Sequence, residues 1–281
     1  MQQNKLKSGN VTLRSAKLTS KRSFFMKKYA GYMIDLDGTI YRGKEKIPAA
    51  KRFIERLQAA KIPFLFVTNN STKAPEQVVE NLAKNFDIHV TTANVYTTAM
   101  ATADYISELD ETKKTAYVIG ELGLKQAILD RGFTFVEQDP DYVVVGLDYD
   151  VTYHKFELAT LAIRNGSKFI GTNADTNLPN ERGLVPGAGS LIALVECATQ
   201  QKPEFIGKPE KIIMEKALKR LGVAKDQVVM VGDNYMTDIK AGINSGIDTM
   251  LVYTGVSTKE QVKKEAIQPT IQLDSLDEWN I

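Results

Sequence analysis

The chain has 281 residues, of which 43% are hydrophobic and 25% are charged, and its formal net charge at pH 7 is +2. This composition is that of an ordinary globular protein, and the length allows one large domain or two smaller ones, of which we expect two. The sequence contains no run of 18 apolar residues, which excludes a membrane-spanning helix, and the single cysteine, Cys197, excludes an intramolecular disulfide.

Residues 1–25 differ from the rest of the chain, because they hold six basic residues and no acidic one. The remainder is therefore net negative. The basic residues are too sparse to predict a nucleic-acid or membrane partner, and the segment lacks the continuous apolar stretch of a signal peptide. We expect residues 1–25 to be a disordered leader and, with only one cysteine, the protein to be cytoplasmic.

The first strand-like segment, Tyr32–Ile34, leads directly into two carboxylates, Asp35 and Asp37, which Gly38 follows. Carboxylates so close repel each other, so the fold must supply a cation or keep one of them protonated. Both conditions suit phosphoryl transfer, in which one carboxylate attacks phosphorus and a neighbouring carboxylic acid protonates the leaving oxygen. Gly38 allows a sharp turn and lets backbone N–H groups approach a phosphate.

A plain turn is the alternative for this segment, because Asp and Gly are common in turns. A calcium-binding loop is excluded, since Thr39, Ile40 and Lys46 occupy the fifth, sixth and twelfth positions of its pattern. The segment by itself does not decide between a turn and a catalytic site.

Helical and strand-like patterns then alternate. Apolar spacing predicts a helix that begins near Pro48, a buried strand at 64–67 and a second helix from Pro75. This order predicts a doubly wound α/β sheet, whose ligands bind beyond the carboxyl ends of the strands. Thr68 and Asn69 follow the second strand and would offer a hydroxyl and an amide to an oxyanion, with a helix cap as the alternative. The inward helix faces are expected to be Ala50, Phe53, Ile54 and Leu57, and Val78, Val79, Leu82 and Phe86.

Residues 92–203 form a second set of alternating segments, long enough for a domain of its own. We expect helices at 97–109, 122–130 and 153–164, strands at 115–119, 142–145 and 168–170, and a long loop at 172–190.

The helix after this loop carries Cys197, which we expect to be buried like a small hydrophobic residue. His89 and His154 are the only histidines, and neither has a second ligand at metal-binding spacing, so both are predicted to be structural. The expected inner face of the helix is Leu191, Leu194, Val195 and Ala198.

The first pattern resumes at Phe205 and Ile206, which read as a short strand before Lys208, with Pro209 at the start of a helix. The segment lacks the residues of a nucleotide-binding P-loop. A lone lysine is usually a solvated charge, but one between a strand and a helix is a reasonable phosphate partner. The inner face of this helix is expected to be Ile213, Ala217 and Leu221.

The next strand, at 228–231, is followed by Asp233 and Asp238, so two carboxylates again follow a strand. A helix N-cap at Thr237 or Asp238 is compatible with a role in the site. A last strand at 249–253 is expected to close the sheet.

Together these segments resemble, in order, the four motifs of the haloacid dehalogenase superfamily of phosphatases. The motifs are Asp35-x-Asp37-Gly38-Thr39, Thr68-Asn69, Gly207-Lys208-Pro209 and Gly232-Asp233-x4-Asp238. The insert between the second and third motifs resembles the α/β cap of the NagD-like subfamily, as do Thr172-Asn173-x-Asp175 and Pro186-Gly187-x-Gly189. The resemblance implies an α/β fold with a doubly wound, Rossmann-like parallel-sheet core at 26–91 and 204–281 and an inserted α/β cap domain at 92–203.

The same resemblance implies a role for each motif residue. Asp35 would be the nucleophile, and Asp37 the general acid and then the base for the attacking water. Mg²⁺ would be held by the Asp35 carboxylate, the Asp37 backbone carbonyl and Asp233, and Asp238 would position a metal-bound water or Lys208. The phosphate oxygens would be held by Thr68 and Lys208.

We therefore expect Mg²⁺-dependent hydrolysis of small phosphate monoesters, such as sugar phosphates or nucleoside monophosphates, through an aspartyl-phosphate intermediate. A phosphotransferase or phosphomutase would use the same residues, and a phosphometabolite-binding regulator without catalysis is a third reading. The expected partner is a small phosphorylated metabolite, and a homodimer through the cap is left open. In the cap, Asp175 is the first candidate for contact with the leaving group, with an Asx-type turn as its alternative and Glu121 and Asp148 as the next candidates.

Overall fold

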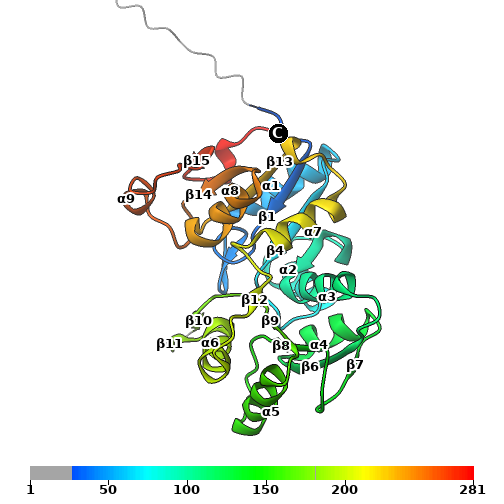
Figure 1. The fold of residues 1–281 in the computed structure, drawn as a ribbon. Coiled ribbons are helices and arrows are strands. Elements are labelled where there is room, and N and C mark those ends of the chain that lie inside the picture. The colour runs from blue at the N-terminus through cyan, green and yellow to red at the C-terminus, as the bar shows by residue number, and fades with distance from the viewer. Residues whose placement is uncertain (1–26, 181) are drawn as a thin grey trace, which may run out of the picture.

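The structure is a computed structural model that describes residues 27–180 and 182–281, so the expected leader at 1–25 lies outside the described residues. Two parallel sheets form two bodies, one above the other in Figure 1. Within the described ranges, none of the helices has both the length and the apolar character needed to cross a membrane.

The core sheet has six strands, each parallel to its neighbours. In sheet order the strands are β15 (Ile271–Leu273), β14 (Asp248–Val252), β13 (Val228–Gly232), β1 (Gly31–Ile34), β4 (Phe64–Thr68) and β5 (Val95–Thr97). Met33 of β1 pairs with Met230 on one side and with Leu65 on the other. Because β1, β4 and β13 are buried on both faces, their sequences are nearly continuous apolar runs, and the predicted strands at 64–67 and 228–231 are confirmed.

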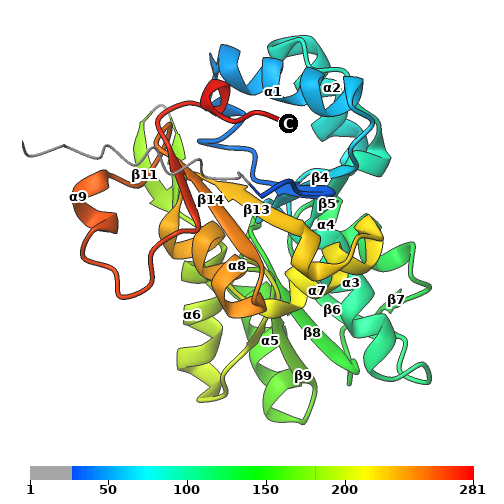
Figure 2. The same ribbon diagram turned by 90° about the horizontal axis from the view of Figure 1, so that it is seen from above.

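Helices cover both faces of the core sheet, as the view from above in Figure 2 shows. Tyr32 and Ile34 of β1 face α1 (Pro48–Ala59) and α2 (Pro75–Phe86), while Met33 faces the opposite side. Each large apolar side chain buried in this way contributes about 1.5–3 kcal/mol. The opposite side is covered by α3 (Thr98–Leu109), α7 (Lys211–Leu221) and α8 (Lys240–Ser245).

The expected inner faces of the core helices are largely confirmed. All four residues expected inside α1 are buried, and in α2 only Val79 is half-buried rather than buried. In α7, Ile213 and Ala217 are buried but Leu221 is half-buried. The expected helix start at Pro209 is wrong, because Pro209 lies in a turn and α7 begins at Lys211.

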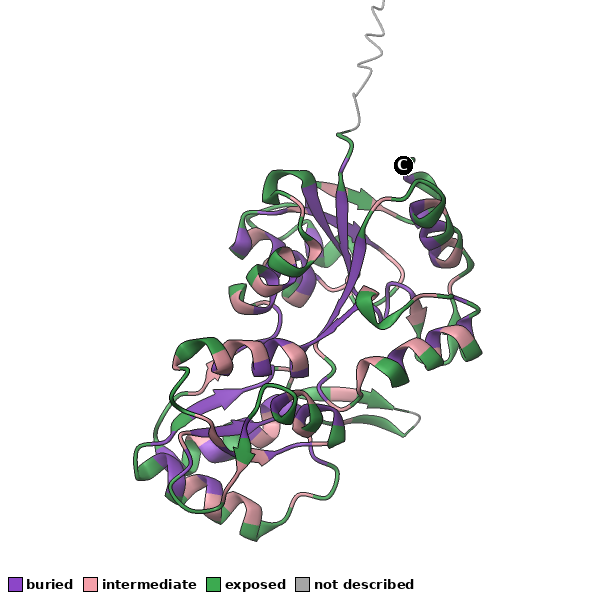
Figure 3. Ribbon diagram, turned by 90° about the vertical axis from the view of Figure 1, so that its right-hand side faces the viewer, coloured by how far each residue is buried: buried purple, intermediate pink, exposed green. Residues whose placement is uncertain are grey.

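The cap sheet has five strands, each parallel to its neighbours. In sheet order they are β12 (Glu204–Phe205), β9 (Lys168–Gly171), β8 (Tyr142–Val145), β6 (Thr115–Ile119) and β7 (Thr134–Phe135). The side chains of Ala116 and Val144 pack with α4 (Leu122–Leu129) and α3, whereas Val143 and Val145 pack with α5 (Tyr153–Arg164) and α6 (Ala188–Thr199). In both bodies of Figure 3, the strands are mostly buried and the helices around them are exposed on their outer sides.

The chain passes between the two sheets at α3 and at residues 206–210. β5 belongs to the core sheet although it lies after residue 92, and β12 belongs to the cap sheet. The short strand at Phe205 therefore pairs with β9 of the cap and does not resume the core as expected. We propose on this basis that the cap domain begins after β5, within or just after α3, and ends near residue 206.

Short elements complete the fold. The expected last strand at 249–253 does not close the sheet, because β15 pairs with it on its outer side. The sequence did not predict β15, since the three residues of this strand are only partly buried and make no apolar run. The long loop at 172–190 contains a β-hairpin that its polar sequence did not predict. The short elements are β2 (Tyr41–Arg42), β3 (Glu45–Lys46), β10 (Asn177–Asn180), β11 (Gly183–Pro186) and α9 (Lys259–Val262).

Two expectations for α6 are wrong. Of its expected inner face, Val195 is buried and Leu191 half-buried, but Leu194 and Ala198 are exposed and Ile192 is buried instead. Cys197 is also exposed. A helix that is apolar nearly all round gives a weak periodic signal, so its inward face is poorly defined by sequence.

Candidate active site

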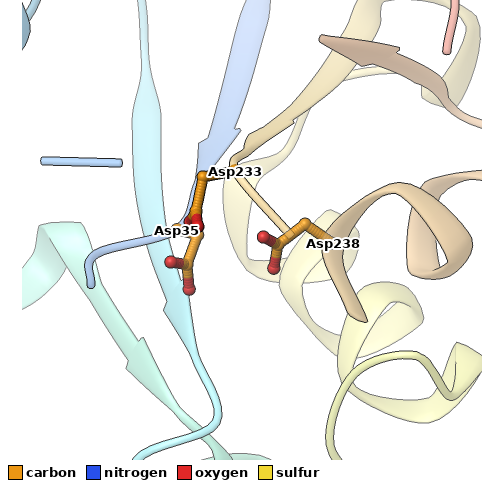
Figure 4. A group of neighbouring side chains, drawn as sticks. All are labelled: Asp35, Asp233 and Asp238. Atoms are coloured by element: carbon orange, nitrogen blue, oxygen red, sulfur yellow. The ribbon is translucent and has the colours of Figure 1, made fainter. Parts of the chain in front are cut away.

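Asp35 lies at the end of the central strand of the core sheet. Its backbone N–H donates to the carbonyl of Val231 at 2.9 Å, which extends the pairing of β1 with β13 by one residue. The carboxylate is thus brought to the carboxyl edge of the sheet, beside the residues that follow β13 (Figure 4). A parallel sheet places strand ends from distant parts of the sequence at one edge.

Gly38 makes the turn that follows. Its φ is +95°, a value that residues with a side chain rarely adopt, and a Cβ atom there would lie 2.3 Å from Oδ2 of Asp233. Its N–H donates to the carbonyl of Tyr41 at 2.6 Å. The N–H of Gly38 itself is engaged in the turn, and the absence of a side chain lets Asp233 approach the backbone. That Gly38 lets backbone N–H groups approach a phosphate stays a prediction.

Lys208 is the central cation of the site. Its ammonium lies 2.5 Å from Oδ1 of Asp35 and 2.7 Å from Oδ1 of Asp238, and the side chain is only 2% exposed. Burial opposes the charged ammonium, but the charges of Asp238 and Asp35 outweigh it and raise the pKa of Lys208 above its ordinary value. The other oxygen of Asp35, Oδ2, accepts no hydrogen bond within the part of the chain that the structure describes.

Asp233 completes a group of three acids. One carboxylate oxygen from each of Asp35, Asp233 and Asp238 lies within 4.8 Å of the others. Thr39 Oγ1 donates to Oδ1 of Asp233 at 3.1 Å, and the N–H of Val256 donates to Oδ2 at 2.7 Å.

The electrostatics of this group show an excess of negative charge, because three carboxylates face one ammonium. Burial raises the pKa of Asp35 well above its ordinary value; the Lys208 ammonium counteracts this, while the charges of Asp238 and Asp233 add to it. Burial and the charge of Asp238 likewise raise the pKa of Asp233 to about 7. Buried carboxylate oxygens without enough positive charge are the donor set that a hard divalent cation such as Mg²⁺ prefers. The residues present fit such an ion.

Asp37 stands apart from the three acids. Its side chain is exposed, and Oδ1 accepts a hydrogen bond from the N–H of Gly43 at 3.2 Å. A group that exchanges protons with a leaving group and with water must be reachable from both, and this placement allows it.

Thr68 and Asn69 follow β4 at the same edge. Thr68 Oγ1 accepts from the N–H of Asn70 at 3.2 Å, which leaves its own proton free to be donated. The side-chain amide of Asn69 is already engaged, since Oδ1 accepts from the N–H of Lys208 at 2.8 Å and Nδ2 donates to the Lys208 carbonyl at 2.9 Å. Asn69 Nδ2 also donates to Oδ2 of Asp175 at 2.8 Å. Both N–H groups of the Asn69 amide are therefore engaged within the protein, which differs from the predicted donation to an oxyanion.

The cap closes over these groups. A cavity of about 500 Å³ lies between core and cap, and Asp35, Asp37, Thr68 and Lys208 are among its lining residues. From the cap, Leu147, Tyr149, Asp175 and Leu178 line the cavity. Asp175 also accepts from Nδ2 of Asn173 at 2.6 Å, so a side-chain contact within the loop and a contact to the core coexist.

The other predicted residues lie elsewhere or act differently. Glu121 and Asp148 are outside the cavity lining, and both histidines are exposed side chains beside carboxylates. The N-cap after β13 is Asn234, whose side chain accepts from the N–H of Met236, and not Thr237 or Asp238.

Three supporting groups were missed by sequence analysis. Thr39 and the N–H of Val256 bind Asp233, and Thr254 Oγ1 donates to the carbonyl of Gly38 at 2.6 Å. Thr254 and Val256 follow β14, so the rule that sites form at strand ends would have found their position but not their function.

Comparison with known proteins agrees with this arrangement. A family model for haloacid dehalogenase-like hydrolases matches residues 32–134, and a second, HAD-hydrolase-like model matches residues 205–279. The 5'-nucleotidase YutF of Bacillus subtilis (strain 168) is 51% identical over 254 residues, which cover 90% of this chain and 98% of that protein. An acid sugar phosphatase of Staphylococcus epidermidis is 52% identical over 253 residues, which cover 90% of this chain and 97% of that protein.

Solved structures share the fold over nearly the same length. A double mutant of the thermostable NPPase from Geobacillus stearothermophilus has a TM-score of 0.85 at 52% identity, with 91% of this chain and 99% of that chain covered. NagD from E. coli K-12 has a TM-score of 0.85 at 31% identity, with coverages of 90% and 99%. The resemblance inferred from the four motifs is confirmed: the chain belongs to the haloacid dehalogenase superfamily and is a phosphatase of its NagD-like subfamily.

Proposed function

We propose that the protein hydrolyses small phosphate monoesters with Mg²⁺ through a phosphoryl group held on Asp35. The observation that carries this proposal is the setting of the Asp35 carboxylate. One oxygen is held by Lys208 at 2.5 Å, the other accepts no hydrogen bond among the described residues, and Asp35 is one of the residues that line the cavity. A fixed carboxylate with one free oxygen is suited to attack on phosphorus.

The first displacement forms a bond between Asp35 and phosphorus and breaks the bond to the leaving oxygen, which takes a proton from Asp37. In the second, water attacks phosphorus, Asp37 accepts its proton, and the Asp35 carboxylate is restored. Thr68 and Lys208 donate to the phosphoryl oxygens throughout, and Asp238 holds Lys208 in place.

Asp35 and Asp233 would hold Mg²⁺, with the Asp37 backbone carbonyl, and with Asp238 directly or through water. When bound, the ion would polarise the phosphoryl oxygens and offset the buried negative charge. At an effective dielectric near 20, two unit charges 4 Å apart interact by about 4 kcal/mol, so an anionic nucleophile cannot approach a phosphate dianion without such compensation.

The cavity and the relatives suggest the substrate class. The leaving group would lie among aromatic and apolar side chains of Tyr41, Tyr149 and Leu178, with Arg42 and Lys73 also on the lining. Relatives of this chain are named 5'-nucleotidase and acid sugar phosphatase. We propose nucleoside monophosphates and sugar phosphates as the substrate class.

Phosphate release from p-nitrophenyl phosphate, with Mg²⁺ or with EDTA, tests the reaction and its metal. A panel of nucleoside monophosphates, sugar phosphates, phosphoglycolate and pyridoxal phosphate then tests the substrate class. A phosphotransferase would instead move phosphate to an added alcohol, and a regulator without catalysis would release none. The cytoplasmic location and a homodimer through the cap stay predictions.

A further inference from the structure

Lys208 has an unusual place in the chain, because it lies on the segment that returns from the cap to the core. β12 ends at Phe205 in the cap sheet, and α7 begins at Lys211 in the core. The N–H of Gly207 donates to the carbonyl of Thr172 at 2.8 Å, so the cap holds the residue just before Lys208. A catalytic cation on a connection between two domains needs a fixed point of its own, or any shift of the cap would move it.

Asn69 supplies that fixed point from the core. Its side-chain amide both accepts from the Lys208 N–H at 2.8 Å and donates to the Lys208 carbonyl at 2.9 Å, so it grips the main chain of one residue from both sides. Gly207 is required for this grip, since a Cβ atom there would lie 2.7 Å from Asn69 Oδ1. Because both backbone groups are held, the Cα atom of Lys208 is fixed, and its side chain extends from a defined position toward Asp35.

The cap supplies the third contact of the same amide. Asp175, after β9, accepts from Asn69 Nδ2 at 2.8 Å, and Asn173 Nδ2 holds the same carboxylate oxygen at 2.6 Å. The Asn69–Asp175 bond joins the two domains directly beside Lys208. It also fixes which way the amide faces, because only Nδ2 can donate to a carboxylate and only Oδ1 can accept from the Lys208 N–H.

From these contacts we propose that Asn69 is a positioning residue for Lys208, and that Asp175 orients Asn69 when the cap is docked. Placement of the catalytic ammonium is thereby coupled to docking of the cap. The inference rests on the proposed function, in which Lys208 holds the transferring phosphate. It assigns Asp175 to the assembly of the site instead of to direct contact with the leaving group.

Steady-state kinetics on p-nitrophenyl phosphate with saturating Mg²⁺ test this coupling. Asn69→Ala is expected to lower kcat by about 10–100-fold, and Asp175→Ala by about 5–20-fold, with KM changed by less than about threefold, because a small displacement of a catalytic group acts on the transition state. The double variant should be no slower than Asn69→Ala, since both changes break one connection. Asp175→Asn keeps an acceptor oxygen and should recover most of kcat.

The matched control is Asn165→Ala, which breaks another Asn–Asp bond of the cap, from Asn165 Nδ2 to Oδ1 of Asp139 at 2.5 Å. It should leave kcat within about twofold of the wild type, as expected for a site away from the chemistry. If Asn69→Ala does not fold, Asn69→Asp takes its place, because it keeps the size and the acceptor oxygen and removes the donor. It should show the same loss of kcat.

The inference is overturned if Asn69→Ala keeps kcat within twofold, or if the two single losses multiply in the double variant. Losses for Asp175→Ala that appear in KM and vary with the leaving group would also overturn it, and would assign Asp175 to substrate binding. A wild-type protein that releases no phosphate would contradict the proposed function itself, a result separate from any of these.

Discussion

The core sheet and the cap sheet are built alike, yet they differ in the charges that follow their strands. Both are parallel and covered by helices on two faces. In the core, Asp35 and Asp233 follow β1 and β13 and belong to a buried group with excess negative charge. In the cap, Asp148 follows β8, is bound by Lys155 at 2.9 Å, and lies in a balanced pair.

The difference shows that architecture alone does not make a site. Both sheets offer a carboxyl edge where ligands could bind, as expected for doubly wound folds. Among the described residues, the group of three acids that share one ammonium lies in the core, and such a group can bind a cation or act on phosphorus. In the cap, Lys155 binds both the Asp148 carboxylate and the carbonyl of Asp150 and so holds the loop that follows β8.

Replacing one carboxylate beside each sheet should give the largest difference in kcat between core and cap. Asp35→Asn is expected to reduce kcat on p-nitrophenyl phosphate by at least about 10⁴-fold, because an amide cannot attack phosphorus. Asp148→Asn should change kcat by less than about threefold, while lowering Tm, since its pair with Lys155 is outside the cavity. Comparable losses for both variants would remove the distinction between core and cap.

Two lysines that bind buried carboxylates, Lys208 in the core and Lys155 in the cap, give the next largest contrast. Lys208→Ala should lower kcat by about 10³-fold and destabilise the metal-free protein by about 3–5 kcal/mol, since it leaves Asp35 and Asp238 unpaired. Lys155→Ala removes a partly exposed ammonium and leaves the buried Asp148 carboxylate without its cation, so it should cost less, about 1–3 kcal/mol, with little change in kcat. Urea unfolding in EDTA and steady-state kinetics measure the two effects, and a Lys208→Ala enzyme with near-normal kcat would refute the role of this ammonium.

Metal and pH should act on the core only. Burial and the charge of Asp238 raise the pKa of Asp233 from its ordinary value of 3.8 to about 7 in the metal-free site. Because the folded-state pKa is the higher one, the stability that this group contributes is present below about pH 4 and is lost as the pH rises through about 7. Mg²⁺ needs the ionised carboxylate, so its stabilising effect should grow over the same range.

We therefore expect the rise in Tm caused by Mg²⁺ to be at least about 3 °C larger at about pH 8 than at about pH 5.5. Asp233→Asn should abolish most of this pH dependence and raise the Mg²⁺ concentration needed for half-maximal activity. An unaltered Mg²⁺ requirement in that variant would place the metal elsewhere.

The smallest effect should come from the outer surface of the cap. Cys197→Ser replaces an exposed side chain of α6 and should shift Tm by less than about 2 °C and leave kcat unchanged. A buried cysteine, as the sequence suggests, would instead lose several degrees. Thermal unfolding of the two proteins decides between these outcomes.

The core could be predicted from sequence because its strands are long apolar runs buried on both faces, and its helices have one clear apolar face. The cap was harder at its margins. α6 is apolar nearly all round, so its inward face was predicted only in part, and β10 and β11 are short and largely exposed. In the core, β15 was missed because it is also short and only partly buried. The position of β12 in the cap sheet depends on pairing with β9, which no local pattern encodes.

The residues of the site could be predicted by type and order, but their partnerships could not. Strand ends and acidic spacing indicated Asp35, Asp233 and Lys208, and the structure brings them together. The bond from Asn69 to Asp175 joins residues 106 positions apart, and its existence depends on how two domains dock. The role of the Val256 N–H could not be predicted, because every residue except proline offers a backbone N–H.

The stereochemical course at phosphorus tests most directly the claim that Asp35 carries the phosphoryl group. A phosphorothioate monoester made chiral at phosphorus with two oxygen isotopes is hydrolysed in water that carries the third, and the configuration of the released thiophosphate is determined. Two successive in-line displacements, first by Asp35 and then by water, predict net retention of configuration. Net inversion would show that water attacks the substrate directly, and would contradict the covalent role of Asp35.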